Sequence, residues 1–395
     1  DVWARDTQGS INYSVCICQY YHLYINGQYW GVFQTQERPE AAFGASYFGG
    51  EREEWDCVKA TGPNAGYTIE ATDGTLDYWQ DLWELTNNLP SATVSQRTAL
   101  YFQMQGLNTD GTRNPGYPVL LDVDNLIDYM IMVFYDGDLD APVSWFLGND
   151  QTNNWYGIRC RSGEEGFRYF VHDAEHVMKA AERTNRGVVN RTGPYIAGLY
   201  FQHSNPQWIH QRLMLIPEYR LRFADHAHKH LFNSGLLTKD AAVGCFLTRA
   251  GQIDMAIIAE SARWGSLSLN KNAWQVSIDR EVDSFFPTRA GTVVNHLRNA
   301  TLWDGGAVAP LYPSVGVPTF NQNGGEVSSG FDLTIYASSG DIYYTIDGSD
   351  PREPVTGNPV GIWYNNNPIT LTKSTHVKAR VYSGGTWSAL NEAVF

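Results

Sequence analysis

LLDVDNLIDYMIMVFYDGDLD, residues 120–140, predicts a helix that leads into an acidic loop. Asp122 is a residue type that caps helix N-termini, and the apolar side chains after it recur at helical spacing up to Tyr135. The acidic loop, Asp136-Gly-Asp-Leu-Asp140, follows without a break. The helix is therefore expected to present several carboxylates at its C-terminal end.

Two short strands are predicted downstream, over residues 155–161 and 167–172, with a polar turn between them. Asn153-Asn154 precedes the first strand, and Asp173-Ala-Glu175 follows the second. In an extended backbone, residues two apart point to the same side, so these two carboxylates are expected to face the same way. The order along the chain is thus helix, acidic loop, Asn pair, hairpin and acidic pair.

This order suits phosphoryl transfer that depends on a magnesium ion. Such a site needs one carboxylate to orient or deprotonate the attacking hydroxyl, and further oxygen ligands to hold the metal against the phosphates. Asp140 is the candidate base. Asp173 is the candidate principal metal ligand, together with Asn154, or Asn153, from the loop and with Glu175.

The N-terminal part predicts the pieces of a small lobe. Strand-like runs over residues 20–25 and 29–34 flank Asn-Gly, a strong hairpin signal because both turn residues need positive φ. A helix is expected over residues 39–48, where two glycines end it, and a strand over residues 55–60.

Several short segments occur in a fixed order along the chain: HLYINGQYWGVF (22–33), ERP (37–39), YFGG (47–50), DCVK (56–59), GDLD (137–140), NNWY (153–156) and FVHDAEH (170–176). In this order and spacing they resemble the CotH-type atypical kinases, first named from spore coats. The His-Arg-Asp and Asp-Phe-Gly motifs of ordinary protein kinases are absent from the sequence. The resemblance therefore rests on the combination of segments.

The resemblance implies an α+β fold with an atypical, two-lobed kinase-like domain, and ATP bound between the lobes with magnesium or manganese. It also implies that Lys59 contacts the nucleotide phosphates and that Glu37 pairs with this lysine or orients it. Taken alone, both residues are ordinary surface charges. Because the chain starts within what the resemblance identifies as the small lobe, that lobe is expected to be incomplete, with any upstream phosphate-covering loop outside this sequence.

One departure from the family pattern leaves two assignments open. The family often has its Asn pair close behind the loop aspartate, whereas residues 141–152 intervene here. The sequence therefore does not decide which asparagine reaches the metal, or whether Asp138 or Asp140 is the base.

The composition changes towards the C-terminus. Short alternating runs punctuated by Gly and Pro predict a small β-sandwich, so residues 1–311 are expected to form the kinase-like domain and residues 312–395 an Ig-like accessory module. YYTIDGSDP (343–351) and VKAR (377–380) resemble the C-terminal module of chitobiases and hexosaminidases.

Composition also narrows the classes of partner. The formal net charge of -14 argues against nucleic acid, since a duplex binder needs a basic surface, and favours basic partners or divalent cations. No apolar run has the length of a membrane span.

Trp363 or Trp387 can stack on sugar rings, although packing within the module is the commoner role. The resemblance, which includes residues 260–265, implies an extracellular or cell-surface protein.

Two patterns outside the predicted site have more than one interpretation. The five cysteines are an odd number, so at least one is free or pairs outside the chain. They fit small buried apolar positions, with or without one disulfide. Residues 179–194 are polar and basic and include Arg183, Arg186 and Arg191. They occupy the place of an activation or substrate-docking loop in a kinase, or form a solvated loop.

Two histidine patterns raise the question of zinc. His226 and His230 are four residues apart in a predicted helix, a spacing that can bind zinc, but no third ligand is evident near them in the sequence. A structural role is the better interpretation. A zinc hydrolase that uses His172, Glu175 and His176 fits less well, because these residues follow a strand.

Two functions remain in competition. The first is a metal-dependent phosphotransferase that moves the γ-phosphate of ATP to a Ser or Thr hydroxyl of a protein, which the presence of Lys59, Asp140 and Asp173 together favours. The second is a non-catalytic surface or matrix protein that uses a kinase-like scaffold and binds a structural divalent cation, such as calcium. The intervening residues 141–152 favour the second.

Overall fold

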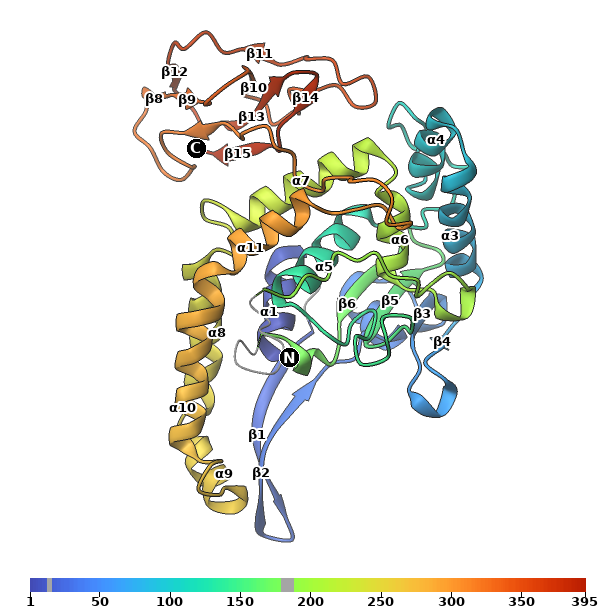
Figure 1. Ribbon diagram of the computed structural model, residues 1–395, viewed down its shortest axis with the longest axis vertical. Coiled ribbons are helices and arrows are strands. Elements are labelled where there is room, and N and C mark those ends of the chain that lie inside the picture. Colours follow the sequence, from blue (N-terminus) through green and yellow to red (C-terminus); the bar gives the residue numbers. More distant parts are fainter. Residues whose placement is uncertain (13–15, 179–187) are drawn as a thin grey trace.

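The computed structural model describes residues 1–12, 16–178 and 188–395. A body of helices surrounds a four-stranded sheet, and a strand-rich module lies at the top in orange and red (Figure 1). The helices of the described residues are α1 (Val2–Asn12), α2 (Ala41–Phe48), α3 (Asp77–Asn88), α4 (Val94–Met104), α5 (Val123–Asp136), α6 (Pro206–Leu213), α7 (Pro217–Leu231), α8 (Lys239–Ile253), α9 (Ala256–Trp264), α10 (Lys271–Arg280) and α11 (Phe286–Arg298). The strands are β1 (Cys18–Ile25), β2 (Gln28–Gln36), β3 (Trp55–Ala60), β4 (Ile69–Asp73), β5 (Trp155–Cys160), β6 (Arg168–Val171), β7 (Thr319–Phe320), β8 (Phe331–Leu333), β9 (Ile335–Tyr336), β10 (Asp341–Thr345), β11 (Ile362–Trp363), β12 (Ile369–Leu371), β13 (His376–Ser383), β14 (Thr386–Trp387) and β15 (Asn391–Val394).

The predicted central helix is confirmed as α5. Every residue of α5 except Asp124 is buried, and the helix lies near the middle of the body (Figure 1). The Asp122 side chain accepts a hydrogen bond from the Asn125 backbone N–H at 3.0 Å, as expected of an N-cap. Gly137, with φ of 68°, ends the helix in the left-handed conformation that glycine adopts without strain.

The small lobe is built on an antiparallel sheet with the order β4-β3-β5-β6. Successive side chains on a strand point to opposite faces, so Trp155 packs into the main core with Trp79 while Tyr156 packs with Phe43 of α2. The sheet is therefore covered by α2 on one face and by helices of the larger lobe on the other. The predicted helix over residues 39–48 and the predicted strands are confirmed.

The first helix, α1, was not predicted from the sequence. Two of its polar side chains, Arg5 and Gln8, are buried, which hides the amphipathic pattern on which sequence reasoning depends. The Gln8 side chain donates to the Tyr169 carbonyl at 2.7 Å and accepts from the Val171 N–H at 2.8 Å. Its amide thus continues the hydrogen-bonding pattern of the sheet along the edge strand β6.

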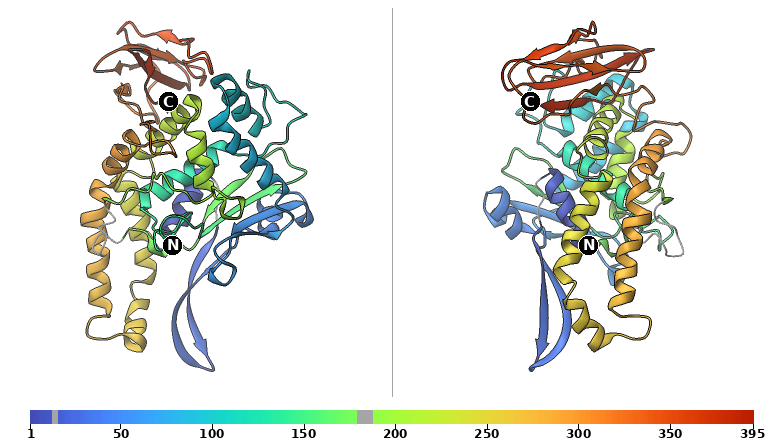
Figure 2. Two further views of the ribbon diagram at one scale, coloured as in Figure 1. Left: turned by 45° about the vertical axis from the view of Figure 1, so that its right-hand side comes forward. Right: turned by 90° about the vertical axis from the view of Figure 1, so that its left-hand side faces the viewer.

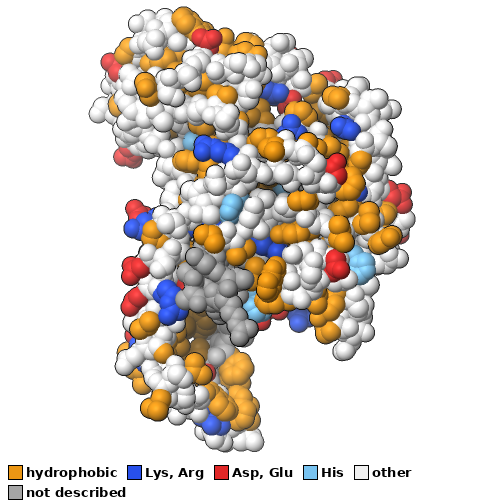
Figure 3. Space-filling view, viewed as in Figure 1, with side chains coloured by type: hydrophobic (Ala, Val, Ile, Leu, Met, Phe, Trp, Pro, Cys, Tyr) orange, Lys and Arg blue, Asp and Glu red, His pale blue; other side chains and the backbone are white. Residues whose placement is uncertain are grey.

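The hairpin β1–β2 forms as predicted, with Asn26 and Gly27 at φ of 51° and 80° in the turn. It projects from the body beside the arm formed by α8, α9 and α10 (Figure 2). Glu260 accepts from the Val32 N–H at 2.7 Å, and the Arg263 guanidinium lies 4.0 Å from the Trp264 ring centroid. Arg263, whose Nε donates to the Tyr29 carbonyl at 3.2 Å, therefore helps to hold the hairpin. Hydrophobic side chains gather at this lower end of the molecule (Figure 3).

The C-terminal module has a core of its own, which includes Phe320, Leu333 and Val377. Its larger sheet has the order β11-β10-β13-β14, with β15 also paired to β13. The module lies over α7 (Figure 1), where the buried Arg380 guanidinium pairs with Asp225 and with Asp350, each at 2.6 Å. The boundary between residues 311 and 312 stays a prediction.

The cysteines of the described residues form no disulfide bond. All five cysteines lie in the described residues and are free thiols.

Within the described ranges no single helix is long and apolar enough to cross a membrane, whereas α8 and α9 pass that test as a pair bent by 63°. Trp387 is buried and Trp363 is 56% exposed, so the two tryptophans of the module differ in their access to solvent.

Stability is expected to fall below neutral pH because of buried neutral histidines. His210 is fully buried beside the Tyr219 hydroxyl, 2.7 Å from its Nδ1, and burial lowers its pKa to about 3. The unfolded chain takes up this proton at about pH 6.5, so between these pH values acid favours unfolding by about 1.4 kcal/mol per pH unit for this group. The thermal midpoint of His210→Gln should therefore decline less steeply from pH 6.5 to 4.

The exposed hairpin histidine gives the matched control for this prediction. His22→Gln should retain the pH dependence of the wild type, because His22 lies in solvent. Equal slopes for wild type and His210→Gln would show that His210 takes up its proton without unfolding.

Candidate active site

The acidic loop and the acidic pair, distant in sequence, are joined by backbone hydrogen bonds. The Leu139 N–H donates to the His176 carbonyl at 3.3 Å, and the Met178 N–H donates to the Asp136 carbonyl at 2.9 Å. The C-terminal end of α5 and the segment after β6 therefore run side by side. This contact places the loop that carries Asp140 beside the segment that carries Asp173, whose pKa the charge of Asp140 helps to raise.

Asp140 is held by three side chains. The Asn153 and Asn154 amides donate to its Oδ2 at 3.1 and 3.0 Å, and the Ser144 hydroxyl donates to its Oδ1. Each amide turns its N–H to Asp140, so its oxygen is the atom that it can offer to a cation. Both asparagines thus reach the site, while Ser144, which has no signal in the sequence, was missed.

Residues 141–152, the departure from the family pattern, form a closed loop. Val143 and Thr152 make an antiparallel bridge, and the Asn153 N–H donates to the Pro142 carbonyl at 3.0 Å. The buried Arg191 guanidinium donates to Asn149 Oδ1 at 2.9 Å and to the Val143 carbonyl. The insertion therefore returns the chain to Asp140 instead of separating the Asn pair from it.

Arg191 belongs to the basic segment for which two interpretations were open. Its burial under the insertion makes it a structural residue. Arg183 and Arg186, the other two arginines of that segment, lie outside the described residues.

Asp138 and Asp140 have different surroundings. Asp138 is buried, and its Oδ1 accepts from the backbone N–H groups of Asp140 at 2.8 Å and Ala141 at 3.1 Å. Burial raises the pKa of Asp138 to about 6. Asp138 therefore shapes the loop, whereas Asp140 presents a half-buried carboxylate to the side chains of the site.

The acidic pair does not have the extended backbone that the sequence suggested. Asp173 is left-handed, with φ of 51°, and Ala174–His176 form a short 3-10 turn. Asn154 is also left-handed, with φ of 49°. Burial, followed by the negative charges of Glu175 and Asp140, raises the pKa of Asp173. Three carboxylates thus repel one another across a site with two strained backbone positions.

A positive region lies beside this acidic cluster. Arg5 Nη2 is 3.1 Å from His172 Nδ1, and burial together with the charges of Arg5, Arg38 and Lys59 lowers the pKa of His172 to about 4. Lys59 is therefore within electrostatic range of the residue that precedes Asp173. Arg5 was missed because the sequence gave no sign of α1.

Lys59 and Glu37 do not pair with each other. Lys59 Nζ is 3.0 Å from Glu70 Oε1, the residue opposite it on β4. Glu37 accepts from the Ile17 N–H and from the Tyr47 hydroxyl, both at 2.9 Å. Glu37 thus ties the start of β1 to α2, and its predicted role beside the nucleotide stays a prediction, as does that of Lys59.

The acidic cluster contains the ligand types of a hard divalent cation, but Asp140, Asp173 and Glu175 do not bring three ligand atoms within 4.8 Å of one another. Asp140, Asp173 and Glu175 offer carboxylate oxygens, and Asn153 and Asn154 offer amide oxygens, which are the ligands that magnesium and calcium prefer. Burial is the main cause of the raised pKa of Asp173, and the negative charges of Glu175 and Asp140, which raise it further, favour a positive charge nearby. The sequence assigns Asp173, Glu175 and Asn154 to such an ion, and this assignment stays a prediction.

The zinc interpretation of the same segment does not fit. His172 faces Arg5 and the Tyr156 ring, whereas the His176 ring packs 4.7 Å from that of Phe146. Among the described residues, one group of His, Cys, Asp and Glu side chains has at least three ligand atoms close enough to share a metal ion of any kind, and it lies elsewhere.

Comparison with known families accounts for this architecture. Residues 8–290 match the family described as CotH kinase protein. The chain belongs to this family. Residues 331–390 match the family described as Fn3 associated, which is related to the predicted chitobiase-type module but not identical with it. A search of curated proteins gives no match.

The carboxylate cluster lies in the part of the chain that matches the CotH family. The repulsion between its carboxylates can be tested directly. Asp173→Asn should raise the free energy of unfolding in the presence of a chelator by about 0.5 kcal/mol, a small value because solvent screens this exposed group, and the thermal midpoint should rise slightly with it. Asn is chosen because it tolerates the left-handed backbone better than Ala.

The control changes the same charge outside the cluster. Asp150→Asn, on the exposed part of the insertion, should leave the midpoint unchanged. A lower midpoint for Asp173→Asn than for Asp150→Asn would contradict repulsion at the site.

Proposed function

We propose that this CotH family protein is a metal-dependent phosphotransferase that moves the γ-phosphate of ATP to a Ser or Thr hydroxyl of a protein. The observation that carries the proposal is the placement of Asp140. Two amides and a hydroxyl orient its carboxylate, and its charge acts on Asp173, which follows the hairpin. This is the relation between base and metal ligand that phosphoryl transfer needs.

Each residue has a distinct role in the proposal. Asp140 orients the acceptor hydroxyl and takes its proton, since Asp138 is occupied with the backbone of the loop. Asp173, Glu175 and Asn154 hold the metal ion against the phosphates of ATP. A bound magnesium ion would supply positive charge to the transferring phosphoryl group.

The positive region provides the second half of the phosphate site. The side chain of Lys59 is 25% exposed and forms an ion pair with Glu70, whose side chain is 48% exposed. A surface ion pair of this kind contributes little, so the ammonium group can turn to a phosphate at low cost. Arg5, held against His172, adds charge from the neighbouring α1.

The acceptor is proposed to be a protein segment because of the surface beside Asp140. Trp145 and Phe146 directly follow Ser144 and are 47% and 49% exposed. An apolar surface next to the base can hold a peptide close to Asp140, and the net charge of -14 favours a basic one.

The module and the cellular location belong to the same proposal. We place the protein outside the cell or at its surface, where the chitobiase-like features of the module would contact glycans through the exposed Trp363. The non-catalytic alternative, a surface protein with a structural calcium or other divalent cation, predicts metal binding without nucleotide binding.

Nucleotide binding is expected to require both the metal and Asp173. Calorimetric titration of ATP with Mg²⁺ or Mn²⁺ should show binding to the wild type, none without the metal, and none to Asp173→Asn. Asp150→Asn should bind ATP as the wild type does. Metal binding without any ATP binding in the wild type would favour the non-catalytic alternative.

Turnover should depend on Asp140 without a matching change in nucleotide affinity. Asp140→Asn keeps the size of the side chain but removes the proton acceptor, so phosphate transfer from radiolabelled ATP to a basic protein should fall by about a hundredfold to ten-thousandfold. The Kd for ATP should stay close to the wild-type value. Unchanged turnover in this variant would exclude Asp140 as the base.

A further inference from the structure

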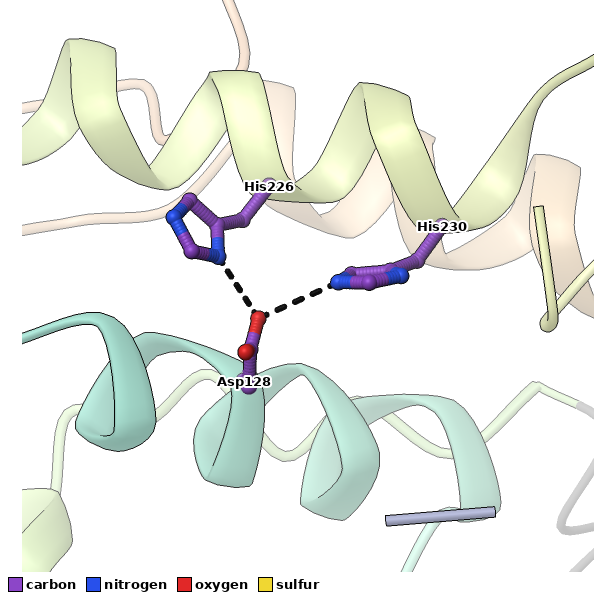
Figure 4. A group of neighbouring side chains, drawn as sticks. All are labelled: Asp128, His226 and His230. Carbon is purple, nitrogen blue, oxygen red and sulfur yellow. Dashed lines mark hydrogen bonds and ion pairs between the residues drawn. The ribbon is translucent and has the colours of Figure 1, made fainter. Parts of the chain in front are cut away.

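A second cluster of potential ligands lies away from the candidate active site, between α5 and α7. His226 and His230 point from α7 towards α5, and Asp128 points from α5 between them (Figure 4). Asp128 Oδ1 is 2.6 Å from His226 Nδ1 and 3.1 Å from His230 Nε2. The three ligand atoms lie within 4.8 Å of one another.

The cluster is shielded from bulk solvent. The side chains of Asp128 and His230 are 6% and 4% exposed, and that of His226 is 19% exposed. Polar groups that are buried this deeply need hydrogen-bonding or ionic partners, since an unpaired group there would destabilise the fold. The sequence showed the His226 and His230 spacing, and the tertiary structure adds Asp128 as the third ligand.

A second layer of contacts fixes the ring of His226. Its Nε2 lies 3.0 Å from Asp124 Oδ1, and Arg222 holds both oxygens of Asp124 at 2.6 and 2.7 Å. In metal sites the ring nitrogen that does not bind the metal commonly donates to a carboxylate in this way, which sets the tautomer. Here that arrangement directs Nδ1 of His226 at Asp128 and His230.

The hydrogen atoms of the cluster show what a metal would replace. Both nitrogens of His226 face carboxylate oxygens, and a proton on Nδ1 would lie between that nitrogen and Asp128. A metal ion bound by the Nδ1 lone pair would occupy the place of that Nδ1 proton, which leaves to solvent. The Nε2–H bond to Asp124 would be retained.

We propose that Asp128, His226 and His230 form a binding site for a divalent transition metal, of which Zn²⁺ fits best. Two imidazole nitrogens and one carboxylate oxygen are a ligand set that zinc accepts and magnesium does not prefer. The fourth position would be taken by water. The ion would join α5, which leads into the acidic loop, to α7, on which the C-terminal module lies.

The geometry needs only a small adjustment. Zinc bonds of about 2.0–2.1 Å place tetrahedral ligand atoms about 3.3 Å apart, close to the distance between Asp128 and His230. The carboxylate oxygen of Asp128 would move about 0.7 Å away from His226 Nδ1, from 2.6 Å to about 3.3 Å. An ion can approach through a cavity of about 650 Å³ that is lined by His226, Asp124 and Arg222.

The test is calorimetric titration of Zn²⁺ into the full chain with Mg²⁺ in excess, so that the acidic cluster near Asp140 is occupied. The wild type should bind one equivalent, and its thermal midpoint should rise on binding. Asp128→Asn and His230→Gln should lose more than about tenfold in affinity. Asp124→Asn, which touches no metal, should weaken binding by about tenfold to a hundredfold.

Two controls separate this site from others. His228→Gln changes the neighbouring α7 histidine that faces Tyr312, and Asp173→Asn changes the candidate active site; both should bind Zn²⁺ as the wild type does. Absence of Zn²⁺ binding in the wild type, or equal binding by wild type, Asp128→Asn and His230→Gln, would overturn the proposal.

A measurement on the wild type alone covers the case in which a variant does not fold. The zinc-edge X-ray absorption spectrum of the complex reports the ligands directly. Two imidazole ligands would support the site, whereas sulfur ligation, or oxygen ligation alone, would overturn it.

Discussion

The burial of every residue of α5 except Asp124 is the constraint on which the rest of the structure depends. A helix with no exposed face must satisfy its polar side chains inside the protein, because an unpaired buried polar group destabilises the fold. Asn125 accepts from the Tyr169 N–H of β6 at 2.6 Å, Asp128 contacts two histidines of α7, and Asp136 accepts from the Asp138 N–H at 3.1 Å. Each of these side chains therefore fixes a different neighbour: the sheet, the helix beneath the C-terminal module, and the acidic loop.

The same constraint explains why carboxylates gather at one point. Asn125 at the start of α5 and Gln8 of α1 both bind the edge of β6, and the segment after β6 is bonded to the C-terminal end of α5 through the Leu139 and Met178 N–H groups. Asp173 leaves the strand in a left-handed conformation, and its charge opposes those of Asp140 and Glu175. A fold optimised for stability alone would avoid both features, which are typical of sites that bind a charged ligand.

Ion pairs hold the C-terminal module against α7. Arg380 of the module is buried against Asp225 of α7, and Arg352 pairs with Glu218 at 2.6 Å. Buried ion pairs contribute little net stability because of their desolvation, but removal of one partner is costly. Such pairs define one orientation of the module on α7, the helix that also carries the histidines of the proposed zinc site.

The sequence by itself determined the local elements. Asp122 as a cap, Asn26-Gly27 as a turn and the alternation along residues 55–60 act over a few residues, so the helix, hairpin and strand could be predicted, as could the order of the acidic groups. The tertiary structure alone decided which distant groups meet. It placed both asparagines on Asp140, gave Glu37 and Lys59 separate partners, and added Asp128 to His226 and His230. These contacts depend on how buried polar groups are satisfied between elements far apart in the chain, which no local pattern encodes.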